Sequence, residues 1–533
     1  MSLPFRNTGY FSSLISDLAE QHPRLSSFVS RFPSIDNFLD QIEEKEACYS
    51  IETRKTLSSN LKDQYAPIKD NKVALSQIEL LKEKNTFTVT TGHQLNLMTG
   101  PLYFIYKIIS TINLCNQLKK KYPTYNFIPI YWMASEDHDF DEISFFHFQG
   151  KKIKWNVNEN GAVGRLSLES LQSVLDVFEQ NLGSNANAKQ LRLMISNSYR
   201  SSNTLAEATF KLVHQLFGQT GLLVLEPDTP SLKSLFIPFI LNELTKYECE
   251  TCVNKSIDEL KEKYDESFKP QVNPRKINLF YLTKNTRKRI VQTPDGFSTV
   301  DTNKQFTREE MIKEVEIHPE RFSPNVLMRP LYQETILPNL AYVGGGGEIA
   351  YWLELKNYFT SQRVPFPLLF VRNSVMLIPS KSAKKIQKLQ LDVVDLFMKR
   401  NALINKKIRQ ISNIDLDLQD FKKQLEVQFA TLTSLVEETD ASFKGALEAQ
   451  KVKQFKGIDN LEKRLLKAQK KKLVDHVSRL TILHETLFPA ESLQERKANF
   501  FDFYMEYGEK LIPLIQENLN PFSFDFTCLI IED

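Results

Sequence analysis

Apolar and polar positions follow two different periods through the middle of the chain. Short runs rich in β-branched and aromatic residues predict strands at Thr86–Thr91, Phe127–Met133, Leu222–Glu226 and Pro367–Arg372. Between the first two, Phe104–Lys120 has the period of a helix. Strands that alternate with helices are typical of a parallel α/β sheet, so we predict a Rossmann-like core over residues 61–380.

Other parts of the pattern surround and interrupt this core. Helical periodicity at Phe11–Glu20, Ile35–Glu44 and Ile51–Leu61 predicts that residues 1–60 are mostly helical and pack on the core. Residues 143–165 indicate antiparallel strands, and residues 265–300 indicate a second β-rich element. Neither fits a plain doubly wound sheet. We therefore expect insertions near 143–205 and 240–320.

The C-terminal third has a different pattern. Lys381–Phe488 contains no proline and only two glycines, and its apolar residues recur at helical steps, which predicts a coiled-coil domain over 381–490. A loop near Ser412–Asp417 would let two helices fold back as an antiparallel hairpin, although pairing between two copies is equally allowed. Lys451–Lys472 is basic; it is either a solvated helix face or a surface for an anionic ligand or a partner subunit. Residues 491–533 are expected to return to the core.

Composition narrows the function classes. The 533 residues include 68 Lys and Arg and 65 Asp and Glu, for a net charge of +3, which argues against a dedicated nucleic-acid binder. The sequence has no apolar run of about 20 residues, so no membrane span is predicted. The N-terminus lacks a signal pattern, and we therefore expect a cytoplasmic protein. Cys249 and Cys252 have the spacing of half a zinc site, but no second half is evident, so we interpret them as structural.

The densest group of candidate chemistry follows the second predicted strand. Residues 134–142 hold five acids and one histidine, and ligands of parallel sheets sit outside the carboxyl ends of the strands. The candidate catalytic residues are Glu136, Asp137, His138, Asp139 and Asp141. Clustered carboxylates repel one another unless a cation or a proton compensates them, and they are suited to Mg²⁺, to ribose hydroxyls or to proton transfer. A solvated acidic loop is the alternative.

A second group follows the first predicted strand. Residues 90–107 form a strand, a glycine-containing turn and a helix that begins after Pro101, a junction that can bind anions through free backbone N–H groups. The candidate nucleotide- or substrate-binding residues are Thr91, Gly92, His93, Gln94, Thr99, Gly100 and Lys107. A purely structural turn is the alternative, because many such junctions contain glycine and threonine.

A third group lies between residues 323 and 373. Four consecutive glycines precede a helix-like run, and such a run implies positive φ or a ligand at contact distance, unless it is a flexible hinge. Arginine binds carboxylate or phosphate in a bidentate manner. The candidate binding residues here are Arg329, Gln333, Gly344, Gly345, Gly346, Gly347, Glu348, Arg372 and Asn373.

These motifs together resemble a known family. Thr-Gly-His-Gln and Thr-Gly-Pro (91–101), Ser-Glu-Asp-His-Asp-Phe-Asp-Glu (135–142), Asn278–Tyr281 and the long 323–352 motif are similar, in this order, to bacillithiol synthase, a family of cysteine ligases. The resemblance covers the whole chain, including Leu493–Arg496. It implies a Rossmann-like core related to class I aminoacyl-tRNA synthetases, connective-peptide-type insertions, a coiled coil and a homodimer.

The resemblance also implies a reaction, in which L-cysteine is joined to glucosaminyl-malate through an amide bond. We expect ATP to be the co-substrate that activates the cysteine carboxylate, with Mg²⁺ as a possible companion. Two alternatives stay open at this point. The same core could serve a nucleotidyl- or glycosyltransferase, or it could be a nucleotide-binding scaffold without catalysis.

Overall fold

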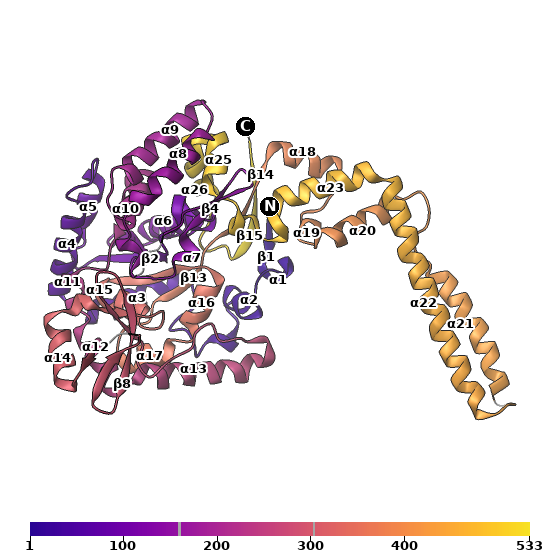
Figure 1. The fold of residues 1–533 in the computed structure, drawn as a ribbon, viewed down its shortest axis with the longest axis horizontal. Coiled ribbons are helices and arrows are strands. Elements are labelled where there is room, and N and C mark those ends of the chain that lie inside the picture. The colour runs from indigo at the N-terminus through magenta and orange to yellow at the C-terminus, as the bar shows by residue number, and fades with distance from the viewer. Residues whose placement is uncertain (158–160, 302–303, 437, 533) are drawn as a thin grey trace. The chain divides into compact units, whose positions relative to one another are not determined.

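The computed structural model describes residues 1–157, 161–301, 304–436 and 438–532, which form two compact units. The larger unit consists of Ser2–Met376 and Glu495–Leu529, and the smaller one is mainly Leu377–Gln494. Figure 1 shows the course of the chain and labels its elements.

A five-stranded parallel sheet is the centre of the larger unit. Its strand order is β13 (Leu368–Val371), β12 (Asn339–Gly344), β2 (Thr86–His93), β3 (Asn126–Met133) and β6 (Leu223–Leu225). The strands are buried on both faces, which explains their nearly continuous apolar sequences. The predicted α/β class is confirmed, and the four predicted strands lie within about two residues of the observed ones.

Helices cover this sheet. α6 (Tyr103–Lys121) connects β2 to β3, as the periodicity of 104–120 predicts, and Leu114 and Leu118 pack with the strand residues Val89 and Ala341. α3 (Phe38–Cys48) adds Phe38 to the same core. In the sequence, α3 lies between α2 (Ser13–Ala19) and α4 (Ile51–Tyr65). Figure 1 shows β2 and β13 inside the unit, surrounded by helices. The expected helical N-terminal segment is confirmed.

Two antiparallel elements interrupt the core. β4 (Phe145–Phe148) and β5 (Lys151–Lys154) form a hairpin in the first predicted insertion, and 3₁₀ and α-helical segments follow it. The second predicted insertion contains four strands of a five-stranded sheet, which we call the inserted sheet, and the remaining strand begins at Phe322, just past the predicted end at 320. The strand order of the inserted sheet is β10 (Gln305–Phe306), β9 (Gly296–Thr299), β8 (Arg287–Thr293), β7 (Leu279–Leu282) and β11 (Phe322–Pro324). The expectation of β structure in both regions is confirmed.

The end of the chain rejoins its beginning. In β15 (Asp525–Ile531), Thr527 is paired with Ser2 of β1 (Ser2–Pro4). Helices α25 (Phe500–Tyr507) and α26 (Leu511–Asn518) also belong to the larger unit. Asn113 of α6 donates hydrogen bonds to the carbonyl groups of Gln516 and Leu519. The C-terminal segment is therefore a structural part of the Rossmann-like unit.

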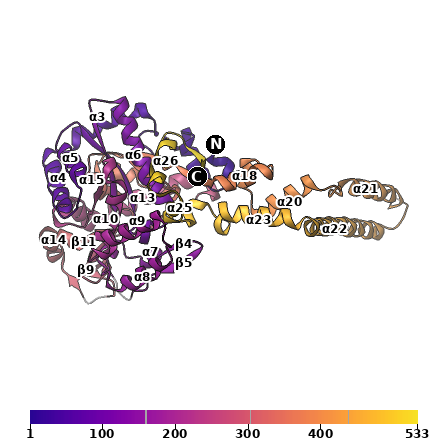
Figure 2. The ribbon, with the colours of Figure 1, turned by 90° about the horizontal axis from the view of Figure 1, so that it is seen from above.

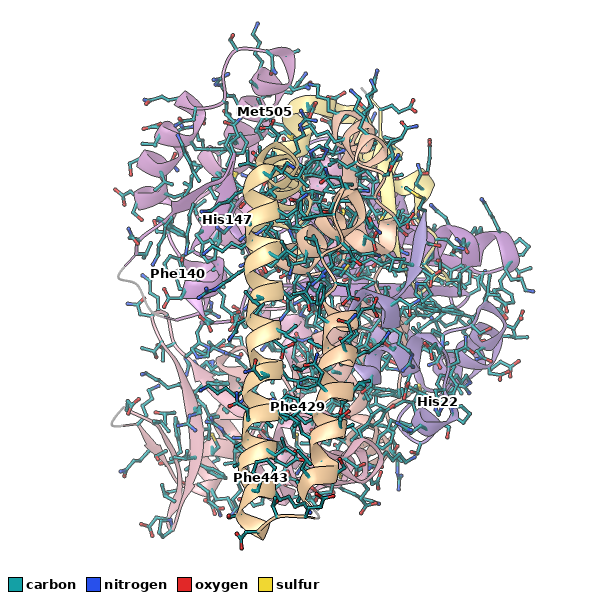
Figure 3. All side chains as sticks on the ribbon, turned by 90° about the vertical axis from the view of Figure 1, so that its right-hand side faces the viewer. His22, Phe140, His147, Phe429, Phe443 and Met505 are labelled. Carbon is teal, nitrogen blue, oxygen red and sulfur yellow. The ribbon has the colours of Figure 1, made fainter. Side chains whose placement is uncertain are left out.

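The smaller unit is helical, with α20 (Arg400–Ile411), α21 (Gln419–Thr433), α22 (Ala441–Lys472) and α23 (Val474–Leu487). Figures 2 and 3 show α21 and α22 side by side. A break does occur at 412–418, but the prediction that the chain folds back there is wrong. The antiparallel pair is α21 with α22, and the reversal lies between them, where Asp440 caps the start of α22.

Ion pairs hold this helical pair in register. Lys422 of α21 lies 2.6 Å from Asp459 of α22, and Lys451 of α22 lies 2.6 Å from Glu426 of α21. Arg409 of α20 also reaches α22, at 2.7 Å from Glu462. No helix among the described residues is long and apolar enough to cross a membrane.

Candidate functional site

A cavity of about 1020 Å³ lies at the carboxyl ends of the parallel strands. β2, the first strand in sequence, has β3 on one side and β12 on the other, so the chain changes direction between β2 and β12. This is the topological switch point at which open α/β sheets bind ligands. The cavity is therefore where the fold itself places a binding site.

The structure brings twelve of the predicted site residues to the wall of this cavity. They are Gly92, His93, Gln94, Glu136, Asp137, His138, Arg329, Gly345, Gly346, Gly347, Glu348 and Arg372. The other predicted residues do not line it: Thr91, Thr99, Gly100, Lys107, Gln333, Gly344, Asn373, Asp139 and Asp141. Several members of this second set support the first, as their contacts show.

The acidic cluster divides into buried and exposed parts. Glu136 is buried and accepts a hydrogen bond from Lys233, whose ammonium group also donates to the carbonyl of Phe322 at 2.8 Å. Burial raises the pKa of Glu136, and the charge of Lys233 opposes that rise. Asp139 is exposed, and the 90% exposed side chain of Asp141 lies 3.8 Å from Lys154. The prediction that five acidic-cluster residues form one site is too broad.

Asp137 is the carboxylate of this cluster that faces the cavity, and its cationic neighbour, Arg287, is distant. Its Oδ2 accepts a hydrogen bond from Gln94 Nε2 at 2.8 Å, and its Oδ1 accepts one from the backbone N–H of His138 at 2.7 Å. The guanidinium of Arg287 lies 4.0 Å away. With 29% of its side chain exposed, Asp137 can contact a ligand directly.

Lys107 fixes the switch point rather than lining it. Its buried ammonium group donates to the carbonyl of Gly92 and to both carboxylate oxygens of Glu348, at 2.9 and 2.7 Å. Tyr342 and the N–H of Gly345 donate to the same carboxylate at 3.0 and 2.8 Å. Burial disfavours the charged form of Glu348, but the positive charge of Lys107 keeps the pKa of Glu348 below its usual value. The expected role of Lys107 in holding phosphate is thus replaced by a role in joining β2 to α16 (Gly346–Leu353).

His93 lies beside the pair of Lys107 and Glu348, and its ring is neutral. Burial, together with the charge of Lys107, lowers the pKa of His93 to about 3. The ring stacks on Phe104 with 5.0 Å between centroids, and its Nε2 is buried without a partner among the described residues. At neutral pH, His93 can therefore offer a hydrogen bond to a ligand but not a positive charge.

None of the four glycines that end β12 and begin α16 has positive φ, and close packing constrains only the first of them, Gly344. A Cβ on Gly344 would lie 3.0 Å from Tyr342 Cε1 and 3.1 Å from Ile349 Cδ1. A Cβ on Gly347 would meet only Gln271, at 4.0 Å, so the backbone there is open to the cavity. The predicted positive φ is wrong, and the open backbone at Gly347 leaves room for the predicted close approach of a ligand.

Arg329 places an unpaired positive charge at the switch point. Its guanidinium donates to Gln333 at 3.0 Å and to Tyr351 at 3.2 Å, and it lies 5.9 Å from the ring of Trp132. Among the described residues no carboxylate lies within 4.0 Å of it. A Cβ on Gly92 would lie 3.7 Å from Arg329 Nη1, so glycine leaves the guanidinium accessible. Gln333 lies outside the cavity, and it orients Arg329 through this hydrogen bond.

Arg372, which lines the cavity, and the predicted residues outside the cavity are held by contacts within the protein. Arg372 forms a buried bidentate pair with Glu495, at 2.8 and 2.9 Å, and Asn373 bonds to Ser110 of α6 at 3.0 Å. Thr91 donates to the carbonyl of Val343 at 2.7 Å and so joins β2 to β12. Thr99 and Gly100 both have positive φ, 66° and 61°, and belong to a buried turn outside the cavity.

The sequence analysis missed the positive wall that the inserted sheet contributes. Four cationic side chains of this wall, which the sequence analysis did not name as site residues, are Arg275, Arg287, Lys288 and Arg289; Arg496 of α24 (Gln494–Lys497) also lines the cavity. A signal was present, because β8 begins with three consecutive basic residues, 287–289. Its meaning depended on the fold, which brings the inserted sheet against the ends of the parallel strands.

The side chains of the cavity can be compared with those that Mg²⁺ and a nucleotide require. Among the residues that the structure describes, no three His, Cys, Asp or Glu side chains are grouped to hold a metal. A Mg²⁺ ion that arrives with a nucleotide needs only one or two carboxylates, because phosphate oxygens and water complete its coordination. The described cavity residues therefore do not by themselves specify a Mg²⁺ site, whereas Arg329 and the cationic side chains of the inserted sheet fit the phosphates of a nucleotide.

Two family models match the chain over nearly its whole length. The model described as Bacillithiol biosynthesis BshC, N-terminal Rossmann-like domain, matches residues 1–373. The BshC C-terminal coiled-coil domain matches residues 375–531. The predicted Rossmann-like core and coiled-coil domain are therefore confirmed.

Relatives agree with this match. A protein of Flavobacterium johnsoniae named "Putative cysteine ligase BshC" is 48% identical over 529 residues, which are 99% of each chain. Proteins of the same name from Christiangramia forsetii and Bacillus cereus are 48% identical over 531 residues (99% of this chain and 98% of the relative) and 28% identical over 488 residues (89% of each). The resemblance found in the motifs is thus confirmed, and the chain belongs to the BshC family of bacillithiol biosynthesis.

Proposed function

We propose that this chain is an ATP-dependent ligase that joins the carboxyl group of L-cysteine to the amine of glucosaminyl-malate. One observation carries this proposal. A single cavity holds the guanidinium of Arg329, which has no ion pair among the described residues, together with the partly exposed carboxylate of Asp137. Both substrates carry an amine and at least one carboxylate, so such a cavity offers complementary charges to each of them.

The proposed reaction has two steps. ATP transfers a phosphoryl group to the cysteine carboxylate and releases ADP, or transfers an adenylyl group and releases pyrophosphate, and either transfer creates a leaving group on the acyl carbon. The acceptor amine then attacks that carbon, the phosphate or AMP departs, and the amine proton passes to a base. Asp137 is the group in the cavity best placed to take it, because Glu136 is paired with Lys233 and Glu348 with Lys107.

The test is to incubate the full chain with L-cysteine, glucosaminyl-malate and ATP–Mg²⁺, and to follow products by mass spectrometry. We expect the condensed thiol together with AMP for an adenylate or ADP for an acyl phosphate. Omission of each substrate in turn is the control. Turnover of nucleotide or sugar without cysteine would indicate a transferase, and no turnover of any substrate would indicate a binding scaffold.

We also propose that α21 and α22 form a homodimer contact. Phe421 and Val427 of α21 are 61% and 66% exposed, and Val452 and Leu461 of α22 are 50% and 57% exposed. Exposed apolar side chains on a paired helix are typical of an interaction surface. Light scattering after gel filtration should give the mass of two chains, and Val427→Glu with Leu461→Glu should reduce it to one. A monomeric parent protein would contradict this.

A further inference from the structure

The ring of His138 is held by one side chain of the inserted sheet. Arg287 Nη1 lies 2.7 Å from His138 Nδ1, although the two residues are 149 positions apart. A guanidinium has only donors, so Nδ1 must be the acceptor and carries no proton. In the neutral ring the proton is then on Nε2.

Arg287 has little freedom to turn away from this contact. Its Nε donates to Ser323 Oγ at 3.1 Å and its Nη2 to the carbonyl of Pro324 at 2.9 Å. The guanidinium also packs on the ring of Phe280 at 4.0 Å, and only 7% of the side chain is exposed. The donor that faces His138 is therefore fixed by β7, β8 and β11 together.

We infer that Arg287 is a positioning residue that holds His138 as the neutral Nε2–H tautomer, so that His138 donates a hydrogen bond into the cavity and is not the general base. The inference rests on the proposed function for the identity of the reaction. In that reaction the Nε2–H suits an oxyanion or phosphate oxygen of the activated cysteine. The role of base is left to Asp137.

The charges around the ring support the neutral form. Burial and the positive charge of Arg287 lower the pKa of His138, and Lys288 acts in the same direction. Asp137, with Oδ1 at 3.7 Å from Nδ1, and Asp139 act in the opposite direction without reversing the shift. Removal of Arg287 would thus leave the acids to favour a protonated ring.

A first test reads the ring directly, without any turnover. Two-bond ¹H–¹⁵N correlation spectra of the full chain, in which His138 is assigned by its loss in His138→Gln, report which ring nitrogen carries the proton. We expect Nε2 protonated and Nδ1 bare in the parent protein, and titration at higher pH in Arg287→Met. Arg308→Met, an exposed arginine on α14 (Arg308–Ile317), is the matched control. A protonated Nδ1 in the parent, or an unchanged titration in folded Arg287→Met, would overturn the inference.

A second test uses the reach of two amides. Glutamine can place an N–H near the position of Nε2, whereas asparagine reaches only the position of Nδ1, and neither can act as a base. We expect His138→Gln to keep kcat within about tenfold of the parent, and His138→Asn and His138→Ala to lose about 10²–10³-fold. Equal losses in all three variants would show a base or a structural role instead. If the parent protein makes no product, the proposed function fails while the spectra still decide the tautomer.

Discussion

The two walls of the cavity carry positive charge in different ways. On and behind the parallel-sheet side, three buried cations are each joined to a carboxylate, in the pairs Lys107–Glu348, Lys233–Glu136 and Arg372–Glu495. On the inserted-sheet side Arg275 and Arg289 are exposed, and neither has an ion pair among the described residues. The difference separates charges that shape the site from charges that are free to meet a ligand.

Two arginines do not follow this difference between the two sides of the cavity. Arg329 lies on the parallel-sheet side but has no carboxylate partner among the described residues, and Arg287 lies on the inserted-sheet side but is buried. Both contact other site residues directly. Groups that depart from the pattern of their wall are therefore the strongest candidates for chemistry.

The largest effect is expected from Asp137, the cavity carboxylate whose cationic neighbour, Arg287, lies 4.0 Å away. Asp137→Asn removes a proton acceptor but keeps an amide that can still accept from Gln94, so kcat should fall about 10²–10⁴-fold. The thermal unfolding midpoint should stay close to that of the parent. A parallel loss of fold and activity would assign Asp137 to the shaping group instead.

The next largest effect is expected for the replacement of Lys233, and it concerns stability rather than kcat. Lys233→Met leaves the buried carboxylate of Glu136 without its cation, which should lower the free energy of unfolding by about 3–5 kcal/mol in urea titrations. The double variant Lys233→Met with Glu136→Leu should recover most of that loss, because it removes both charges. No recovery would mean that shape rather than charge is what Lys233 contributes.

A smaller effect, dependent on pH, is expected for Glu226, which accepts a hydrogen bond from Ser135 beside the site. Burial, with the charge of Asp228, raises the pKa of Glu226 to about 8 from an ordinary value of 4.5. The folded state therefore binds this proton more tightly than the unfolded state. Its stabilising contribution is complete below pH 4.5 and declines as the pH rises toward 8, by at most about 1.4 kcal/mol per pH unit.

Glu226→Gln keeps a hydrogen-bond acceptor without a titratable proton, so the variant should lose this decline. Unfolding midpoints measured between pH 5 and pH 9 should fall less steeply for the variant than for the parent. Glu83→Gln, at an exposed position, serves as the control. Identical slopes for parent and Glu226→Gln would show that Glu226 is already ionised at low pH.

The smallest effect on the fold is expected from the exposed wall. Arg275→Ala combined with Arg289→Ala should change the free energy of unfolding by no more than about 0.5 kcal/mol per substitution. The KM for the anionic substrates should nevertheless rise, and the rise should shrink at high ionic strength because salt screens exposed charges. An unchanged KM would remove these two residues from the binding surface.

Much of the fold was predictable because its signals are local. The strands β2 and β3 and the helix α6 are each specified by a few neighbouring residues whose periodicity survives in the structure. The reversal of the helical hairpin was misplaced for the opposite reason. The break after Ile411 interrupts the helix as strongly as the true reversal before Asp440, and only contacts between α21 and α22 decide between them.

The site was predictable only to the extent that strand ends determine it. Glu136, Asp137 and Gly92 could be placed because each closely follows or ends a recognisable strand. Their partners could not, since Lys233 is 97 positions from Glu136, and Arg287 is 149 positions from His138. A buried carboxylate requires a cation, but the sequence offers 68 of them and does not indicate which one folds against it.

The pair Arg372–Glu495 has a consequence for biosynthesis of the chain. The ribosome must add 123 residues after Arg372 before its carboxylate partner exists, and the whole helical hairpin is made in that interval. Asn499, which bonds to the carbonyl groups of Met98 and Gly100 at 2.8 Å, emerges later still. The Rossmann-like unit of the nascent polypeptide therefore lacks these buried contacts until the segment that follows the helical hairpin has been synthesised.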